Sequence, residues 1–266
     1  MSSFFNNCKS IESRRAFLNF VYEKSRANRI PIEEYSRYLL SDECIDDIDL
    51  IIEGVFELSV PVRKTAVIGG KKRQIYWYSE RETILLSFFN YQLHCYDKCF
   101  IDNLHSGILG RQVKAIPIKI RSHHGISNCY CYRTDIHSYG ASIDRDLIIK
   151  TLKDFIIDDP ELLAFLINYV NGNKCIESGV EYSNAEAVKM GAPLTAFFEN
   201  LYLNKIDHLM NRKAELYIRY CDDIIIYDNT LSHLSELREL FLNETAKLKL
   251  EINPKHDNIY SPGEFV

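Results

Sequence analysis

The sequence lacks the features that would direct a chain into or across a membrane. None of its 266 residues lies in a segment approaching the roughly 20 uninterrupted apolar residues that a membrane-spanning helix requires. The first nine residues also lack the basic region and apolar core of a secretory signal. We therefore expect a cytoplasmic protein without a membrane partner, whose eight cysteines stay reduced.

A common zinc module is also missing. Cys95 and Cys99 form one close pair, and Cys129 and Cys131, near two histidines, form another. Neither pair has the spacing of a common zinc module. Zinc stays open as an alternative, but the alternation of cysteine and tyrosine around Cys129 is typical of a packed strand.

Net positive charge, which would point to a nucleic-acid partner, is absent, because the formal net charge is −5. The distribution of charge is more informative than its sum. Residues 31–60 hold nine acids and one base, whereas residues 60–125 hold eleven bases and four acids. We expect the basic block to hold a phosphate backbone or a triphosphate. The acidic block is either a solvated face or a surface for a protein partner.

The chain does contain an adjacent carboxylate pair, Asp222 and Asp223, within an apolar, β-branched run at 216–228. Such runs favour strands, so the pattern predicts a hairpin with two acids at its tip. Two like charges side by side repel, and water or a cation must offset them. Taken alone, this stretch fits a hard-cation site and a simple Asp-Asp turn equally well.

A second strand-like run, 129–136, also ends on an aspartate, Asp135. A helix should follow from Asp144, a plausible N-cap, and back the sheet that carries the acids. Two strands that each deliver a carboxylate can hold two divalent cations roughly 3.5–4 Å apart. That geometry serves in-line phosphoryl or nucleotidyl transfer.

At these residues the sequence resembles the reverse transcriptases. Tyr220-Cys-Asp-Asp223 matches the family's Tyr-x-Asp-Asp motif, and residues 135–143 resemble its first catalytic motif. The segment Met190-Gly-Ala-Pro-Leu-Thr195, followed by Asn200 and Asp207, is similar to the template-side loop and helix of the bacterial, group II intron-like branch. The three motifs stand in the family's order and spacing.

The resemblance covers roughly residues 60–260 and implies an α+β fold, a right-hand polymerase with fingers and an antiparallel palm sheet backed by helices. It divides the chain into an N-terminal helical extension (1–57), fingers (58–128) and palm (129–266), with a fingers-side insertion at about 157–184. Relatives continue into a helical thumb. We expect the thumb to be missing, or supplied by a protein partner or a further C-terminal segment.

The resemblance also assigns catalytic roles. Asp135 and Asp222, helped by the Ile136 carbonyl, would hold two Mg²⁺ ions, with Mn²⁺ as a substitute, and Asp223 would support the geometry. One ion would activate a primer 3′-hydroxyl and the other would steady the pyrophosphate. Lys255 matches by position the lysine that protonates the leaving pyrophosphate.

Nucleotide-binding candidates lie in separate segments. A strand–turn–strand pattern at 60–78, turning at Gly69-Gly70, carries Lys72 and Arg73. The resemblance places these cations over a triphosphate, while solvated turn residues are the alternative for the lysines. Gly191 permits close approach of the backbone to a base pair or phosphate, and Arg111 is a further candidate.

One position departs from the family pattern. The family's second aromatic residue, five positions after the aspartate, lies under the sugar of the incoming nucleotide, but here that position is Gly140, preceded by Tyr139. Either Tyr139 covers the sugar through a shifted backbone, or the pocket is open and ribonucleotides are poorly excluded. A Gly140 that merely allows a tight turn fits both hypotheses.

Periodicity and breakers predict the remaining elements. Asn200 and Asp207 are interpreted as capping or surface residues, and Phe197 and Phe198 as core. The other predictions are helices around Phe17 and from Pro31, at 83–96, after Pro193 and at 234–248, and a short strand at 250–253.

The expected function is that of an RNA-directed DNA polymerase, a nucleotidyltransferase that takes an RNA template, a DNA primer and dNTPs. The sequence shows no helper domains of intron proteins, which favours antiphage defence over intron mobility. The alternatives are an unconventional polymerase, protein-primed or untemplated, and a scaffold that binds nucleic acid without extending it. Gly140 and the missing thumb favour the scaffold. Three intact aspartates oppose it, because an unused cluster of acids costs stability.

Overall fold

The computed structural model describes residues 3–28 and 32–264, and the chain forms two compact units. The first unit comprises Met1–Leu93 and Ile149–Thr195, and the second comprises His94–Ile148 and Ala196–Val266. The chain crosses between them after Leu93, within α8 (Arg145–Phe155) and at the start of α10 (Thr195–Lys213).

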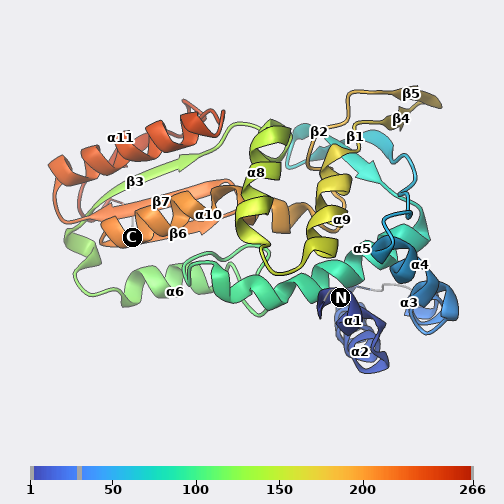
Figure 1. The fold of residues 1–266 in the computed structure, drawn as a ribbon. Helices are drawn as coiled ribbons and strands as arrows, with labels where there is room; N and C mark the ends of the chain where they lie inside the picture. Colours follow the sequence, from blue (N-terminus) through green and yellow to red (C-terminus); the bar gives the residue numbers. More distant parts are fainter. Residues whose placement is uncertain (1–2, 29–31, 265–266) are drawn as a thin grey trace. The chain divides into compact units, whose positions relative to one another are not determined.

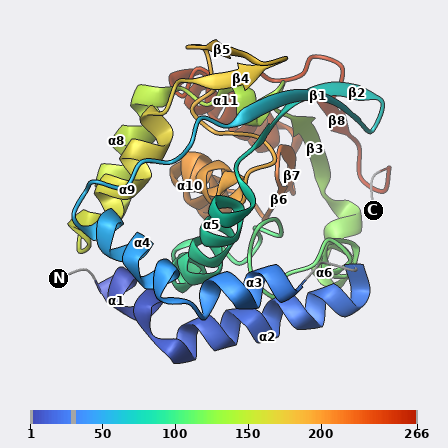
Figure 2. The same ribbon diagram turned by 90° about the vertical axis from the view of Figure 1, so that its right-hand side faces the viewer.

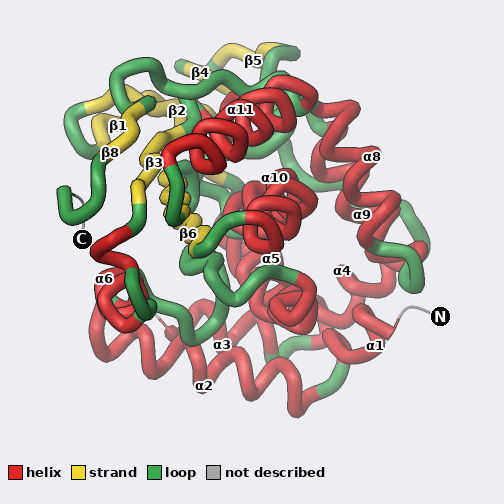
Figure 3. Tube along the Cα trace, turned by 90° about the vertical axis from the view of Figure 1, so that its left-hand side faces the viewer, coloured by secondary structure: helices red, strands yellow, loops and turns green. Residues whose placement is uncertain are grey.

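The N-terminal part of the first unit is helical, as predicted (Figure 3). Its core joins distant segments through aromatic rings, because Phe5 contacts Phe89 and Phe165 at centroid distances of 5.5 and 6.1 Å. The helix around Phe17 is confirmed, while the predicted helix start at Pro31 lies outside the described residues. The helices are α1 (Ser3–Lys9), α2 (Ile11–Asn28), α3 (Ile32–Leu39), α4 (Asp42–Ile52), α5 (Glu80–Leu93) and α9 (Pro160–Asn171).

The predicted hairpin of the first unit is confirmed: β1 (Val62–Ile68) and β2 (Lys71–Trp77) pair antiparallel around the Gly69-Gly70 turn. Two short strands, β4 (Cys175–Glu177) and β5 (Val180–Tyr182), extend the sheet in the order β2-β1-β4-β5 (Figure 2). Both come from the predicted insertion at 157–184, so this part of the chain belongs to the same sheet as the hairpin.

The second unit is built on an antiparallel sheet with strand order β6-β7-β3-β8, as expected for a palm. The two predicted strands that end at carboxylates are both present. The predicted strand at 250–253 is only a single bridge, between Ile252 and Ile136. The strands are β3 (Tyr130–Asp135), β6 (Leu216–Tyr220), β7 (Asp223–Asp228) and β8 (Asn258–Tyr260).

Helices cover both faces of this sheet. On one face, α11 (Leu231–Lys247) runs along β3 and β7 and buries Leu234, Leu237 and Phe241, as the periodicity predicted (Figure 1). On the other face, α6 (Ala115–Ser122) and the short η2 (Ile126–Asn128) pack against a cluster that includes Cys131 and Ile218. That the helix after Asp144 backs the sheet stays a prediction, since most of α8 belongs to the first unit.

Residues 94–128 fall in the second unit, although the resemblance assigned them to the fingers. They begin with the short η1 (His94–Cys99) and then run beside β6, where Leu104 forms a parallel bridge with Arg219. The amide of His105 also donates to the Arg219 carbonyl at 3.0 Å. This backbone pairing, which no local pattern reveals, adds the segment to the edge of the palm sheet.

All eight cysteines are free thiols. Within the described part of the chain, no helix is both long enough and apolar enough to span a bilayer.

Candidate active site

Strand register brings the predicted carboxylates to one end of the palm sheet. Asp135, the last residue of β3, lies directly opposite Asp223, the first residue of β7. Asp222 precedes Asp223 in the turn, and the Asp222 carbonyl accepts a hydrogen bond from the Ile136 amide at 3.2 Å. Asp135 is 8% exposed, whereas Asp223 is open to solvent. The four residues predicted as metal ligands are therefore neighbours in the fold.

The turn that carries Asp222 is a tight one. Tyr220 pairs with Asp223, which leaves Cys221 and Asp222 as a two-residue hairpin loop. Cys221 has φ 52°, the left-handed region that such loops use and that residues other than glycine rarely adopt. Strained backbone of this kind collects at functional sites, where the surrounding structure must hold it.

Both carboxylate oxygens of Asp135 have protein partners. His256 Nδ1 lies 2.6 Å from Oδ1, and Asn253 Nδ2 lies 3.2 Å from Oδ2. The Asn253 side chain also accepts a hydrogen bond from the Lys255 amide at 3.2 Å, which links the predicted catalytic lysine to the site. We did not predict His256 or Asn253. The sequence signal that could have found these two residues is their position, because both flank the Pro254-Lys255 pair.

Arg133 partly offsets the negative charge at this end of the sheet. It lies two residues before Asp135, on the same face of β3, and its guanidinium is 3.8 Å from Asp223. Both side chains are about half exposed, so the pair contributes little to stability. Its main effect is to make the electrostatic potential at this end of the sheet less negative.

The donor chemistry of this cluster fits Mg²⁺, which prefers carboxylate and carbonyl oxygens. Asp135, Asp222, Asp223 and the Ile136 carbonyl supply such oxygens at one end of the sheet. Among residues 3–28 and 32–264, no group of three His, Cys, Asp or Glu side chains is already gathered as a ligand set. The carboxylate and carbonyl oxygens are present at this end of the sheet, but the aspartate side chains must move closer together before they can share one metal ion.

Tyr139 and Gly140 lie in the short helix α7 (Tyr139–Ser142) and are buried. The Tyr139 hydroxyl donates to the Glu199 carbonyl, and burial raises the pKa of Tyr139 well above its ordinary value. The tight turn assigned to Gly140 occurs instead at Ser138, which has φ 50°. Coverage of a sugar by Tyr139 stays a prediction, and in this structure the ring belongs to the interior.

In the first unit, β2 brings two of the nucleotide-binding candidates together. Gly191 lies against this strand: the Met190 carbonyl accepts a hydrogen bond from the Tyr76 amide at 2.8 Å, and a Cβ built on Gly191 would be 2.4 Å from Cγ2 of Ile75. Arg73 shares a face of β2 with Ile75.

Lys72 points to the opposite face of the hairpin, because side chains alternate along a strand. It is exposed, as are Lys71 and Arg73. All three lie in the strand and not in the turn, which consists of Gly69 and Gly70.

Other bases of the block at 60–125 stabilise the fold. Arg63 pairs with Glu177 at 2.8 Å. Arg111, a nucleotide-binding candidate, donates to the carbonyls of Ile101 and Leu104 at 2.6 and 2.8 Å. The guanidinium groups of these two residues therefore already have partners within the protein. A count of basic residues in the sequence could not show this.

The acidic block is also partly internal. Asp47 is buried, with Tyr38 Oη at 2.6 Å and Arg81 Nε at 2.8 Å. Lys9 forms an ion pair with Asp49. The interpretation of the block as a solvated face or a partner surface is wrong for Asp47, which holds α4 to α5.

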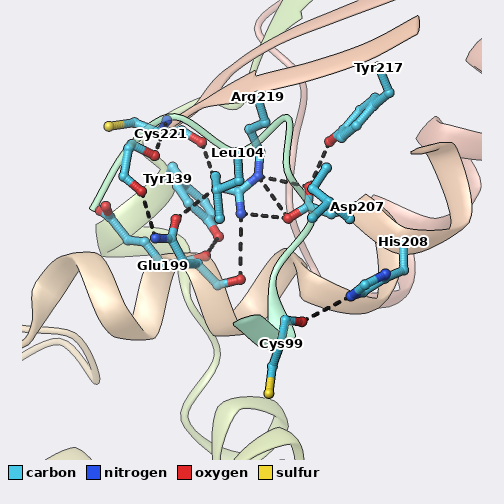
Figure 4. Close-up of polar contacts among 12 residues, drawn as sticks. Cys99, Leu104, Tyr139, Glu199, Asp207, His208, Tyr217, Arg219 and Cys221 are labelled. Carbon is cyan, nitrogen blue, oxygen red and sulfur yellow. Dashed lines mark hydrogen bonds and ion pairs between the residues drawn. The ribbon is translucent and has the colours of Figure 1, made fainter. Parts of the chain in front are cut away.

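A buried polar network lies beneath the Asp222 turn, and sequence reasoning missed it (Figure 4). Asp207, interpreted as a capping or surface residue, is fully buried and forms a salt bridge with the fully buried Arg219 at 2.6 Å. Burial alone lowers the pKa of Arg219, but the charge of Asp207 outweighs it and raises the pKa above its ordinary value. Asn200 is buried as well. The earlier interpretation of both residues is wrong.

The fold is that of the right-hand polymerase class, with fingers and an antiparallel palm. More closely, the chain belongs to the reverse transcriptase (RNA-dependent DNA polymerase) family, whose model matches residues 71–263. A solved structure of apo telomerase from Candida tropicalis, truncated from its C-terminal domain, is similar at 11% identity with a TM-score of 0.58. The match covers 76% of this chain and 50% of that one, and it shows a shared fold. No curated protein matches the sequence.

Proposed function

We propose that this chain is an RNA-directed DNA polymerase that extends a DNA primer on an RNA template with dNTPs. The observation that carries the proposal is the register that sets Asp135 opposite Asp223, beside Asp222 in the turn. These carboxylates and the Ile136 carbonyl would hold two Mg²⁺ ions, or Mn²⁺ in their place. When bound, the ions lower the pKa of the primer 3′-hydroxyl and neutralise charge on the triphosphate.

The chain's own residues supply positioning and charge. Asn253 restrains the orientation of the Asp135 carboxylate through its hydrogen bond to Oδ2. Arg73 and Lys72 present exposed cations that attract a triphosphate. Lys255 is exposed next to Asn253, where its ammonium group is available to protonate the leaving pyrophosphate.

Primer extension tests the proposal. Purified protein is incubated with Mg²⁺ or Mn²⁺, a primed RNA template and dNTPs, alongside Asp222→Ala and Asp135→Asn. We expect the wild type to extend the primer and each variant to lose at least about 10³-fold in rate, because the ions stabilise several kcal/mol of transition-state charge. Asp146→Asn, an exposed aspartate in α8, is the matched control and should keep full activity. Extension that survives Asp222→Ala contradicts the proposal.

Two further reaction mixtures define the substrates. Extension with rNTPs in place of dNTPs would show that Gly140 leaves the sugar pocket open. Products formed without a template or a nucleic-acid primer would assign the chain to the untemplated or protein-primed polymerases.

We propose antiphage defence as the biological role, since the Met190–Thr195 motif is similar to that of the bacterial branch of the family, which includes reverse transcriptases associated with phage defence. Expression from a plasmid should then lower phage plaque numbers, and Asp222→Ala should abolish the protection while Asp146→Asn preserves it. Equal protection by wild type and Asp222→Ala would contradict a role that depends on catalysis.

A second candidate function, non-productive binding of nucleic acid, is favoured by the engagement of both Asp135 oxygens by His256 and Asn253. Filter binding of a primed template in the absence of extension, unchanged by Asp222→Ala, would favour this scaffold role.

A further inference from the structure

The residue before Asp222 is held from two directions. The Cys221 amide donates to Ser106 Oγ at 2.8 Å, and the Cys221 carbonyl accepts from an Nη of Arg219 at 3.0 Å. Both backbone polar groups of this left-handed residue are therefore fixed by side chains from other parts of the second unit. A tight turn at a functional site would otherwise be free to relax.

Arg219 reaches the turn because the rest of its guanidinium is already anchored. Its Nε donates to Asp207 Oδ1 at 2.8 Å, and Nη2 donates to Oδ2 at 2.6 Å. Tyr217 also donates to Asp207, at 2.7 Å. The two parallel hydrogen bonds from Arg219 to Asp207 fix the plane of the guanidinium, so that Nη1 points at the Cys221 carbonyl.

Ser106 is anchored through Asn200, whose side-chain oxygen also accepts a hydrogen bond from Arg219 Nη1 at 3.4 Å. The Asn200 side chain donates to the Ser106 carbonyl at 2.8 Å. The next residue, Gly107, has φ 63°, and a Cβ there would lie 2.8 Å from Cβ of Ala196 and 2.9 Å from the Asn200 side chain. Only glycine allows the segment to approach α10 this closely, which places the Ser106 hydroxyl under the turn.

Fixing the Cys221 carbonyl fixes the start of Asp222. A peptide unit is planar, so the Cys221 carbonyl and the Asp222 amide rotate together. The Asp222 carbonyl is held in turn by the Ile136 amide at 3.2 Å. The backbone of Asp222 is therefore restrained on both sides, which limits the directions in which its carboxylate can point.

We infer that Arg219 and Ser106 are positioning residues that clamp the Cys221 peptide and thereby aim Asp222 at the cation of the active site. The inference rests on the proposed function for its cation and concerns only residues of the second unit. A purely structural role for the pair would affect stability and leave cation affinity unchanged.

Ser106→Ala is the informative variant, since it removes one hydroxyl and leaves the Arg219–Asp207 salt bridge intact. Ser87→Ala is the matched control, because its hydroxyl donates to a helix carbonyl in α5 of the first unit. Ser106→Thr, which keeps a hydroxyl, tests for rescue. Arg219→Lys is a further variant, since lysine cannot contact Asp207 and Cys221 with one rigid fork.

The readouts are Mn²⁺ affinity, measured by electron paramagnetic resonance without substrate, and hydrogen exchange of the Cys221 amide, measured by NMR. We expect Ser106→Ala to weaken Mn²⁺ binding about tenfold, the usual effect of losing a residue that orients a ligand, and to speed exchange at Cys221. Ser106→Thr should restore both, and Ser87→Ala should change neither. Arg219→Lys, where it folds, should weaken Mn²⁺ binding at least as much.

Each outcome decides the matter. Mn²⁺ binding by Ser106→Ala equal to that of Ser87→Ala overturns the inference, whatever the stability of the two proteins. Wild-type protein that binds Mn²⁺ through Asp222, loses affinity in Ser106→Ala and yet extends no primer upholds the clamp and contradicts the proposed polymerase. Wild-type protein that takes up no Mn²⁺ through Asp222 overturns the inference, because there is then no cation for Asp222 to be aimed at.

Discussion

The imidazole Nδ1 of His256 lies 2.6 Å from Oδ1 of Asp135, at the end of the palm sheet where the catalytic carboxylates are predicted to act. An ionised carboxylate only accepts hydrogen bonds, so the imidazole is the donor. A carboxylate oxygen has two lone pairs, and a cation displaces this hydrogen bond when it takes the lone pair that the imidazole uses. His256 is therefore a competitor for one of the lone pairs that Asp135 offers to a metal ion.

Replacing His256 by alanine should lower the Mg²⁺ concentration that gives half-maximal extension. A net hydrogen bond is worth about 1 kcal/mol, which corresponds to about fivefold. His233→Ala is the control, because His233 makes a similar contact with Asp228, 2.9 Å, at the far end of β7. A higher Mg²⁺ requirement in His256→Ala would show that the imidazole orients Asp135 and does not compete for it.

Arg73→Ala should raise the KM for dNTP more than Lys72→Ala does. The two cations point to opposite faces of the β1–β2 hairpin, so they cannot both lie over one triphosphate. We expect about a tenfold increase for Arg73, equivalent to about 1.4 kcal/mol of lost electrostatic attraction, and less than threefold for Lys72. Steady-state kinetics over a range of dNTP concentrations measures both. Equal effects would refute this division of roles.

Gly191→Ala should destabilise the first unit. Gly191 has φ 86°, and the added methyl group would be 2.4 Å from Cγ2 of Ile75. Gly179→Ala is the matched control, because Gly179 has φ 81° with no atom within 4 Å of its Cβ position. We expect about 1 kcal/mol for the control, the backbone cost alone, and about 2–4 kcal/mol for Gly191→Ala in urea unfolding.

An Ile75→Ala background separates the two contributions. Removing the Ile75 side chain relieves the clash but leaves the backbone strain, so the additional cost of Gly191→Ala should fall to about that of Gly179→Ala. An unchanged cost would mean that the clash is not the cause.

Asp257 should stabilise the protein at neutral pH and lose that effect in acid. Arg238 donates to both of its oxygens, which lowers the pKa of Asp257 below its ordinary value of 3.8. The stability from this depressed pKa is fully present above 3.8 and is lost as the pH falls through the folded-state value. Asp257→Asn should therefore cost about 1 kcal/mol at pH 7.

Thermal unfolding from pH 7 to pH 3 checks this dependence, because the difference between wild type and Asp257→Asn should shrink below pH 4. Glu239→Gln is the control, since Glu239 contacts the same Arg238 but is 66% exposed and should contribute little at any pH. A difference that is constant with pH would exclude the ion pair as the source.

The chain's local patterns determined the elements that carry the acids. Runs of apolar, β-branched and aromatic residues predicted β3, β6 and β7, the Gly69-Gly70 pair predicted the β1–β2 turn, and spaced leucines predicted α11, because each depends on residues a few positions apart. The motifs around Asp135 and Asp222 pointed to the reverse transcriptase family, which the family match confirms.

Tertiary structure alone decided which polar side chains meet. Asp207 and Arg219 lie on different elements, and nothing near either residue shows that both are buried and paired. The same holds for His256, whose contact with Asp135 joins residues 121 positions apart. Charge and capping propensity are local properties of a sequence. Burial and partnership arise only when strands and helices pack, because the cost of desolvating a charged group must then be offset by whichever group the fold brings beside it.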